Sequence, residues 1–333
     1  MPILLFILLV PFIFPAKAAT QVAKEVTKTQ QAWSFSKSLN IDPLNVSGII
    51  VNEQFMALAT DEGNQIELFA PSKKGAWQSL HTLTLTRNLD EIDIEALAWQ
   101  KPYLYALGSH SAKRKKIKDN LSQKDNMKRL EHAFLEPARQ QLFRVELDAQ
   151  ANMVEIQTLS LTDVLANHSI LKTFVGIPSK ENGIDIEGLA IDHKGRLLFG
   201  FRGPVLRGNI ALVLRVQLEK KAFKVKKTKT LFLHAQGLGI RGLSEMEQDF
   251  LVLTGAVGDQ AMPYQVSMWD GKNALEGNDY NRKGFTHLCN LPDTGGKPEG
   301  IHFIKSSQNQ IEFVIVNDGL KAGKPTQYQC PMP

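Results

Sequence analysis

Three glutamates and one arginine recur in this chain at one place of a repeated pattern, in which a small residue and an apolar run follow the charged one. A serine takes the same place in a fifth copy. Carboxylates gathered in this way suit proton transfer in ester or phosphoester hydrolysis, and an arginine beside them suits an anionic substrate. The five residues are Ser47, Glu95, Glu187, Arg241 and Glu299.

Further polar residues accompany these positions. Asp93 and Asp185 lie two residues before a glutamate, on the same face of a strand, and we predict that they ligate a divalent cation, Ca²⁺ or Mg²⁺. We predict catalytic roles for Glu95, Glu187, Glu299 and His110, and substrate-binding roles for Arg202, Arg241, Asp61 and Asp318. A second interpretation stays open: such charged residues fix neighbouring sheets structurally, and His110 is a loop histidine.

Each copy of the pattern is followed by more strand-like segments. In the third copy they span residues 187–191, 197–201, 211–216 and 228–233, with turns between them. Four short strands per repeated unit are typical of a β-propeller blade. The sequence therefore predicts an all-β propeller whose first strands line a central channel, where the charged residues meet.

The spacing of the repeats predicts the number of blades. The small residues follow one another at steps of 48, 92, 54 and 58 residues. We predict five four-stranded blades, with a partly helical insertion at about 111–140 in the long step; six blades are the alternative.

The fifth repeated unit contains one strand fewer than the others. We expect Trp33–Leu39 to complete it, so that N- and C-terminal strands close the ring and leave no open sheet edge.

The termini and cysteines bear on location. Residues 1–18 combine an apolar run with Ala16-Lys17-Ala18, which predicts a cleaved signal peptide, followed by a single propeller domain over 33–333. We expect a periplasmic or secreted protein with no membrane span after cleavage. An oxidising compartment permits a disulfide between Cys289 and Cys330, although two free buried thiols are equally compatible with the sequence.

The formal net charge of +5 comes mainly from two basic clusters, at 113–116 and 220–229. Such clusters can bind nucleic acid or anionic lipid. The first belongs to a polar insertion that also holds acidic residues, and the second alternates like a solvated strand, so we expect both to be solvated. Aromatic residues do not interleave with them in the way that nucleic-acid platforms require, which argues against a nucleic-acid partner.

Two segments resemble a known family. Residues 92–98 with 103–110, and residues 183–190 with 198–204, resemble an uncharacterised bacterial family, the domain of unknown function 3616, over about Ser47 to Gly319. The Asp-x-Glu-Gly-Leu-Ala motif is also similar to a motif of esterase-like phytases, which are exported propellers with a proposed phosphoesterase role. The resemblance implies the fold and export. Ala96 in place of glycine and Arg241 in place of glutamate depart from the pattern.

Two functions follow as hypotheses. The first is a hydrolase of phosphoesters or related esters that acts in the central funnel on a small-molecule or anionic ligand. The alternative is a non-catalytic ligand-binding or protein-interaction scaffold with the same funnel. The sequence leaves the substrate, the metal and the oligomeric state open.

Overall fold

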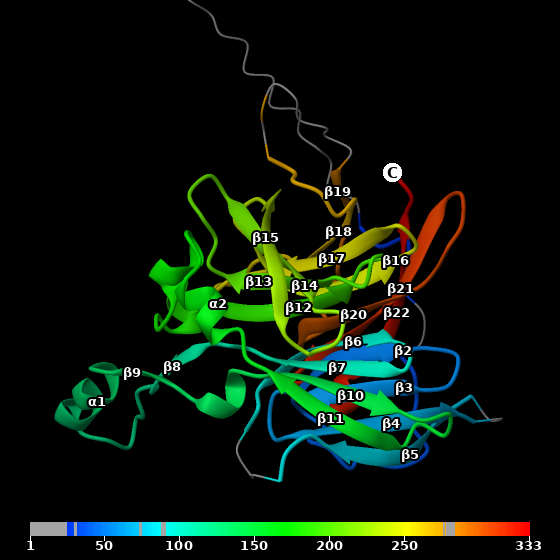
Figure 1. The fold of residues 1–333 in the computed structure, drawn as a ribbon, viewed down its shortest axis with the longest axis horizontal. Helices are drawn as coiled ribbons and strands as arrows, with labels where there is room; N and C mark the ends of the chain where they lie inside the picture. The colour runs from blue at the N-terminus through cyan, green and yellow to red at the C-terminus, as the bar shows by residue number, and fades with distance from the viewer. Residues whose placement is uncertain (1–24, 30–31, 73–74, 88–90, 276, 278–283) are drawn as a thin grey trace, which may run out of the picture.

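The apolar runs of the five repeats form five four-stranded antiparallel sheets in the computed structural model, which describes residues 25–29, 32–72, 75–87, 91–275, 277 and 284–333. The innermost strands of successive sheets contact one another, and the first contacts the last, so the sheets form a closed ring. The fold is therefore the predicted β-propeller with five blades (Figure 1). The predicted signal peptide lies outside the described residues.

Each blade runs outward from its innermost strand. Blade one comprises β2 (Val46–Val51), β3 (Met56–Thr60), β4 (Gln65–Pro71) and β5 (Trp77–Thr84). Blade two comprises β6 (Ile94–Gln100), β7 (Tyr103–Gly108), β10 (Leu142–Leu147) and β11 (Met153–Leu159). Blade three comprises β12 (Asp185–Ile191), β13 (Leu197–Gly203), β14 (Ile210–Leu218) and β15 (Val225–His234). Blade four comprises β16 (Gly239–Met246), β17 (Asp249–Gly255), β18 (Gln265–Trp269) and β19 (Phe285–Asn290). Blade five comprises β20 (Lys297–Ser306), β21 (Gln310–Asp318), β22 (Thr326–Pro331) and β1 (Lys28–Thr29).

The core is divided among the blade interfaces. Five clusters of buried apolar side chains fill the five spaces between neighbouring blades, and the last cluster joins blade five to blade one. Inner strands are therefore covered on both faces; every residue of β3 and of β12 is buried. This explains why these strands read as continuous apolar runs rather than as an alternation.

The long second repeat contains the predicted insertion rather than a sixth blade. Between β7 and β10 the chain forms a small hairpin and a helix that project beyond the sheets (Figure 1). The elements are β8 (Ala112–Arg114), α1 (Gln123–Leu130), β9 (Ala133–Leu135) and the 3₁₀ helix η1 (Pro137–Arg139). Shorter helices follow elsewhere: α2 (Thr162–Ala166), η2 (Leu171–Phe174), η3 (Ser179–Glu181) and η4 (Lys321–Gly323). No helix in the described part of the chain is long and apolar enough to cross a membrane.

The chain ends close the ring, but the expected segment was wrong. The strand that completes blade five is β1, which pairs with β22 through Lys28↔Gln329 and Thr29↔Tyr328. The segment expected there, Trp33–Leu39, instead follows the outer strand of blade one through a bridge between Phe35 and Trp77. Its aromatic side chains pack on that blade, with 5.6 Å between the ring centroids of Trp33 and Trp77. The predicted domain start at residue 33 thus omits one strand.

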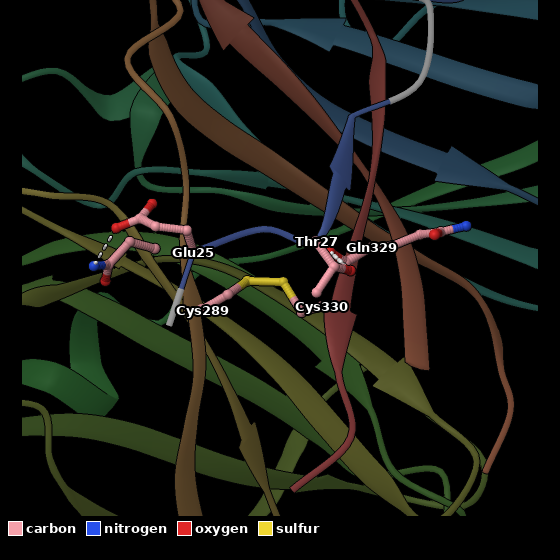
Figure 2. The surroundings of a disulfide bond; sticks show 6 residues. Glu25, Thr27, Cys289, Gln329 and Cys330 are labelled. Carbon is pink, nitrogen blue, oxygen red and sulfur yellow. Dashed lines mark hydrogen bonds between the residues drawn. A yellow bond between two sulfur atoms is a disulfide. The ribbon is translucent and has the colours of Figure 1, made fainter. Parts of the chain in front are cut away.

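A disulfide reinforces the closing seam. Cys289 on β19 and Cys330 on β22 are bonded, so blades four and five are covalently joined. Figure 2 shows the N-terminal segment crossing beside this bond, where the Thr27 hydroxyl donates to the Gln329 carbonyl at 3.0 Å. Glu25 meets blade four, because its carboxylate accepts a 3.3 Å hydrogen bond from the Asn290 amide. Three segments distant in sequence therefore hold the ring closed.

Candidate functional site

The repeated charged residues occupy β-bulges in the innermost strands. In blade two, Ile94 pairs with Gly108 and Ala96 pairs with Leu107, so Glu95 is an extra residue without a cross-strand partner. The register shifts at the same place in every blade. A bulge bends its strand and redirects the extra side chain. The five bulged residues are Ser47, Glu95, Glu187, Arg241 and Glu299.

The small residue after each bulge allows neighbouring inner strands to approach closely. A Cβ atom on Gly242 would lie 2.9 Å from the carbonyl oxygen of Glu299, on the next blade. On Gly188 it would lie 2.8 Å from Cγ of Leu243. Ala96 is buried at the equivalent place of blade two, where a methyl group is accommodated. This close approach brings charged residues of separate blades into contact.

Four of the five bulged residues line one cavity of about 1010 Å³ at an end of the propeller. Its inner part is rich in carboxylates, and its mouth is rich in lysines and arginines. We call this cavity the funnel. Ser47 lies outside its lining, because its hydroxyl donates to the Ile94 carbonyl of the next blade. The charged lining residues are Asp61, Asp93, Glu95, Lys113, Arg114, Lys115, Lys116, Arg139, Lys180, Glu181, Asp185, Glu187, Arg202, Arg241, Asp259, Asp293, Lys297, Glu299 and Asp318.

Two buried arginines hold the carboxylates of three blades together. Arg202 forms ion pairs with Asp185 and, at 2.5 Å, with Oε1 of Glu187. Nη1 of Arg241 lies 3.3 Å from Oε2 of Glu187 and 3.2 Å from Oε1 of Glu299. Because unpaired buried charges are costly, these contacts allow the acidic side chains to remain inside the protein. The prediction that Glu187, Arg241 and Glu299 lie in contact with one another is confirmed.

Glu95 lies beside this network but outside its ion pairs. One oxygen each of Glu95, Asp185 and Glu187 falls within 4.8 Å of the others, the only such group of potential metal ligands among the described residues. Glu95 makes no hydrogen bond or ion pair with a described residue, and Oδ1 of Asp185 and Oε2 of Glu187 are buried without a hydrogen-bond partner there. Such carboxylate oxygens suit a Ca²⁺ or Mg²⁺ site, in which Oε2 of Glu187 would be shared between the cation and Arg241.

Burial shifts the titration of several carboxyl groups upward. The pKa of Glu95 lies well above its usual range because of burial and the nearby Asp93, Glu187, Asp185 and Glu299. Burial, only partly offset by Arg241, raises the pKa of Glu299 to about 8. The pKa of Asp61 rises to about 7 through burial and the charges of Asp318 and Glu62. Clustered groups with shifted pKa values are typical of functional sites.

Two predicted site residues are placed differently from expectation. Asp93 is in the funnel, but it pairs with Arg139 and does not belong to the cluster that could bind a metal; Glu95 and Glu187 take that place beside Asp185. The reason is the bulge, which breaks the strict two-residue alternation on which the expectation for Asp93 depended.

His110 does not line the funnel, so the structure separates it from the other residues predicted to be catalytic. Its Nδ1 atom lies 2.8 Å from the Gly108 carbonyl, and its Nε2 atom accepts a 3.2 Å hydrogen bond from the Leu161 amide. Burial lowers the pKa of His110 to about 4, so the ring is neutral and both nitrogens are occupied. The side chain joins blade two to the segment before α2.

The remaining predicted residues lie in the funnel, and others were missed. Arg202, Asp61 and Asp318 line it, with Asp318 paired to Lys297 at 2.8 Å. Sequence reasoning missed Arg139 and Tyr264, whose ring centroid lies 5.9 Å from the guanidinium of Arg241. Neither residue belongs to a repeated position, so the repeat gave no signal for them.

The sequence model of the family described as "Protein of unknown function (DUF3616)" matches residues 45–329. No curated protein matches the chain. Among solved structures, the chain is similar to a GH43 β-1,3-galactosidase solved with galactodeoxynojirimycin, at 9% identity and a TM-score of 0.47, over 92% of this chain and 94% of that one.

Two further solved structures are similar at the same low level. One is an endo-arabinase from Bacteroides thetaiotaomicron VPI-5482, at 9% identity and a TM-score of 0.49, over 91% of this chain and 98% of that one. The other is Kuenenia stuttgartiensis hydrazine synthase, at 11% identity and a TM-score of 0.37, over 90% and 68%. Similarity at this level transfers no activity to the chain.

Proposed function

Because the chain belongs to the DUF3616 family, whose description assigns no activity, its function has to be inferred from the funnel, and we propose that it hydrolyses phosphoesters or related esters there with a divalent cation. The observation that carries this proposal is the group of Glu95, Asp185 and Glu187, with oxygens within 4.8 Å of one another at the inner end of the cavity.

The charge balance of the inner funnel supports a cation. Four carboxyl groups, those of Glu95, Asp185, Glu187 and Glu299, face two guanidinium groups, those of Arg202 and Arg241. The excess negative charge has to be met by protons, by a cation or by both. Glu95, Asp185 and Glu187 would hold a Ca²⁺ or Mg²⁺ ion, which in such sites polarises the scissile group and lowers the pKa of a bound water.

The surrounding residues have separate tasks in this proposal. Arg202 orients Asp185 and Glu187 through its ion pairs with both carboxylates. Arg241 adds positive charge where negative charge develops on the substrate. Glu299, whose pKa of about 8 leaves it protonated at neutral pH, supplies a proton to the leaving oxygen.

The mouth of the funnel suits a small anionic substrate. Lysines and arginines of the insertion and of blades three and five line it, so an anion is attracted before it meets the carboxylates. Asp61 and Asp318 are proposed to contact neutral or hydroxyl groups of the substrate.

We further propose that the protein works in the periplasm or outside the cell. The Cys289–Cys330 disulfide supports this location, because disulfides persist in oxidising compartments.

The test is turnover of p-nitrophenyl phosphate and a panel of carboxylic and phosphate esters, before and after metal removal with a chelator and re-addition of Ca²⁺ or Mg²⁺. Glu95→Gln is the most informative variant, since Glu95 has no ion pair in the described structure to break. We expect it to lower kcat by about 10²-fold or more, and to reduce the metal found by elemental analysis.

The matched control is Glu312→Gln, the same change at a residue on β21 that pairs with Lys305 at 3.4 Å and does not line the funnel. It should keep the wild-type rate and metal content. Wild-type turnover no greater than background with either cation, across the whole panel, would exclude the hydrolase and leave the ligand-binding scaffold as the function.

A further inference from the structure

The insertion between β7 and β10 has a defined shape but no core of its own. Helix α1 has no buried residue, and its first turn is capped by Ser122, whose hydroxyl accepts a 3.1 Å hydrogen bond from the Asp125 amide. Arg129 donates to the Lys116 carbonyl at 2.6 Å, and Arg114 pairs with Glu181 on η3 at 2.6 Å. Polar contacts therefore fix a segment that projects beyond the blades (Figure 1).

Exposed apolar side chains are concentrated on this insertion. It carries five of the eleven large apolar residues that are exposed in the described part of the chain, although it holds only 30 of the 333 residues. Met127 is 63% exposed and Ile117 is 59% exposed. The other three are Leu121, Leu130 and Leu135. An apolar concentration of this kind is typical of an interaction surface.

The insertion is also the most basic part of the protein. Residues 111–140 contain nine lysines or arginines and four acidic residues, a formal net charge of +5, equal to that of the whole chain. Four exposed lysines there form no ion pair with a described residue, so their charges are available to a partner. These four are Lys115, Lys116, Lys118 and Lys124. We expected the basic cluster at 113–116 to be only a solvated part of a polar insertion. That expectation did not take into account the exposed apolar residues beside it.

We propose that the insertion docks the protein on a membrane surface that contains anionic lipids. Exposed apolar side chains enter the boundary between headgroups and acyl chains, while lysines pair with the negative headgroups. A protein partner fits less well, because protein interfaces are poor in lysine. Long lysine side chains can instead lie along apolar surface and keep their ammonium groups at the headgroups.

Docking in this way has a consequence for the funnel. Lys115, Lys116 and Leu130 line the funnel mouth as well as belonging to the insertion. A membrane against the insertion therefore lies beside the entrance of the cavity. The proposal does not depend on the hydrolase activity, because it concerns only where the protein binds.

The test is co-sedimentation of the full chain with vesicles of phosphatidylglycerol and phosphatidylcholine, against vesicles of phosphatidylcholine alone, at low and high salt. We expect binding to the anionic vesicles that weakens with salt, since these charges are screened. Replacing Lys115, Lys116, Lys118 and Lys124 with glutamine should weaken binding by at least about tenfold, given a contribution of roughly fivefold per lysine near the surface.

A charge-matched control exists on blade three. Lys224, Lys226, Lys227 and Lys229 are four exposed lysines beside which, within described residues 219–234, no large apolar side chain is exposed. Their replacement with glutamine removes the same charge and should leave vesicle binding within about twofold of wild type. Equal losses in the two variants would overturn the proposal, because binding would then follow net charge alone.

A second measurement reports insertion directly. A Met127→Cys variant offers a single free thiol, because both native cysteines are bonded, and a polarity-sensitive fluorophore on it should shift to the blue with anionic vesicles. The same label at Val154→Cys, exposed on β11, should not shift. An unshifted label at residue 127, or binding to soluble polyglutamate as tight as to vesicles, contradicts a lipid partner.

Discussion

Arg241 and Glu299 extend from the innermost strands of neighbouring blades, and 3.2 Å separates Nη1 of the arginine from Oε1 of the glutamate. The same guanidinium lies 3.3 Å from Glu187 on the blade at its other side. One cation thus joins blades three, four and five at the funnel. The contacts that shape the candidate site are also contacts that hold the ring together.

Replacing Arg241 with methionine is therefore expected to destabilise the protein. The change leaves two buried carboxyl groups without their shared cation, and losing one partner of a buried pair costs about 3–5 kcal/mol. The loss should be largest above pH 8, where Glu299 is ionised, and smaller near pH 5, where Glu299 keeps its proton because burial raises its pKa to about 8. Denaturant unfolding at both pH values measures it.

The control for this prediction is Lys128→Met, which breaks the exposed pair between Lys128 and Asp125 on helix α1. Exposed pairs contribute about 1 kcal/mol or less. A variant at Arg241 that is as stable as this control at both pH values would show that the central ion pairs are energetically unimportant.

Glu245 on β16 gives the stability a defined pH dependence. Burial raises the pKa of Glu245 from 4.5 to about 7, although its carboxylate accepts a hydrogen bond from the Ile191 amide. Between these pH values the unfolded chain has lost the proton and the folded chain keeps it, so raising the pH favours unfolding. Relative to Glu245→Gln, the wild type should lose on the order of 3 kcal/mol between pH 4.5 and pH 8.

Chemical denaturation of both proteins across this pH range provides the measurement. Below pH 4 the two proteins should show a constant difference in unfolding free energy, because both states of the wild type then carry the proton. A difference that stays flat across the range, or that moves in favour of the wild type as the pH rises, contradicts the assignment of a raised pKa.

Gly242→Ala tests whether the small residue after a bulge is needed for close approach of the blades. The new methyl group would meet the Glu299 carbonyl oxygen at 2.9 Å, and a backbone atom cannot move aside easily. We expect a loss of about 1–3 kcal/mol. The reverse change at the equivalent place, Ala96→Gly, should cost less, about 0.5–1 kcal/mol. Equal melting temperatures for the alanine variant and the wild type would refute the packing argument.

The disulfide makes a contribution that can be measured separately. Cys289 and Cys330 are 41 residues apart in sequence, and closing a loop of this length restricts the unfolded chain by about 3–4 kcal/mol. A reductant should lower the melting temperature of the wild type to that of a Cys289→Ala, Cys330→Ala variant. The double variant should not respond to the reductant; a response would mean that the reductant acts elsewhere.

The sequence predicted the parts of this architecture that repeat. The recurring small residue and the four strands after it gave five blades, and the equivalence of Glu187, Arg241 and Glu299 placed them together before any contact was known. Repetition is informative because each unit must bury its faces against the next one.

The sequence did not predict features that depend on contacts made in one blade and absent from the other repeats. Arg139 reaches Asp93 from a 3₁₀ turn outside the blades, and the closing strand is the short β1 rather than the more apolar segment Trp33–Leu39. His110 shows a related difficulty, since its type suggested chemistry while its two hydrogen bonds give it a structural task. Tertiary contacts, not local pattern, decided these three cases.

The bulges have one more consequence. A residue in a bulge takes no part in the cross-strand ladder, so blade pairing does not dictate its identity, and serine, glutamate and arginine all occupy the same position here. Strand pairing within each sheet thus leaves these five positions free, and contacts between blades, such as those of Arg241 with Glu187 and Glu299, constrain them instead. In such a propeller, a change of funnel chemistry would require charged residues on neighbouring blades to change together, so that each buried charge keeps a partner.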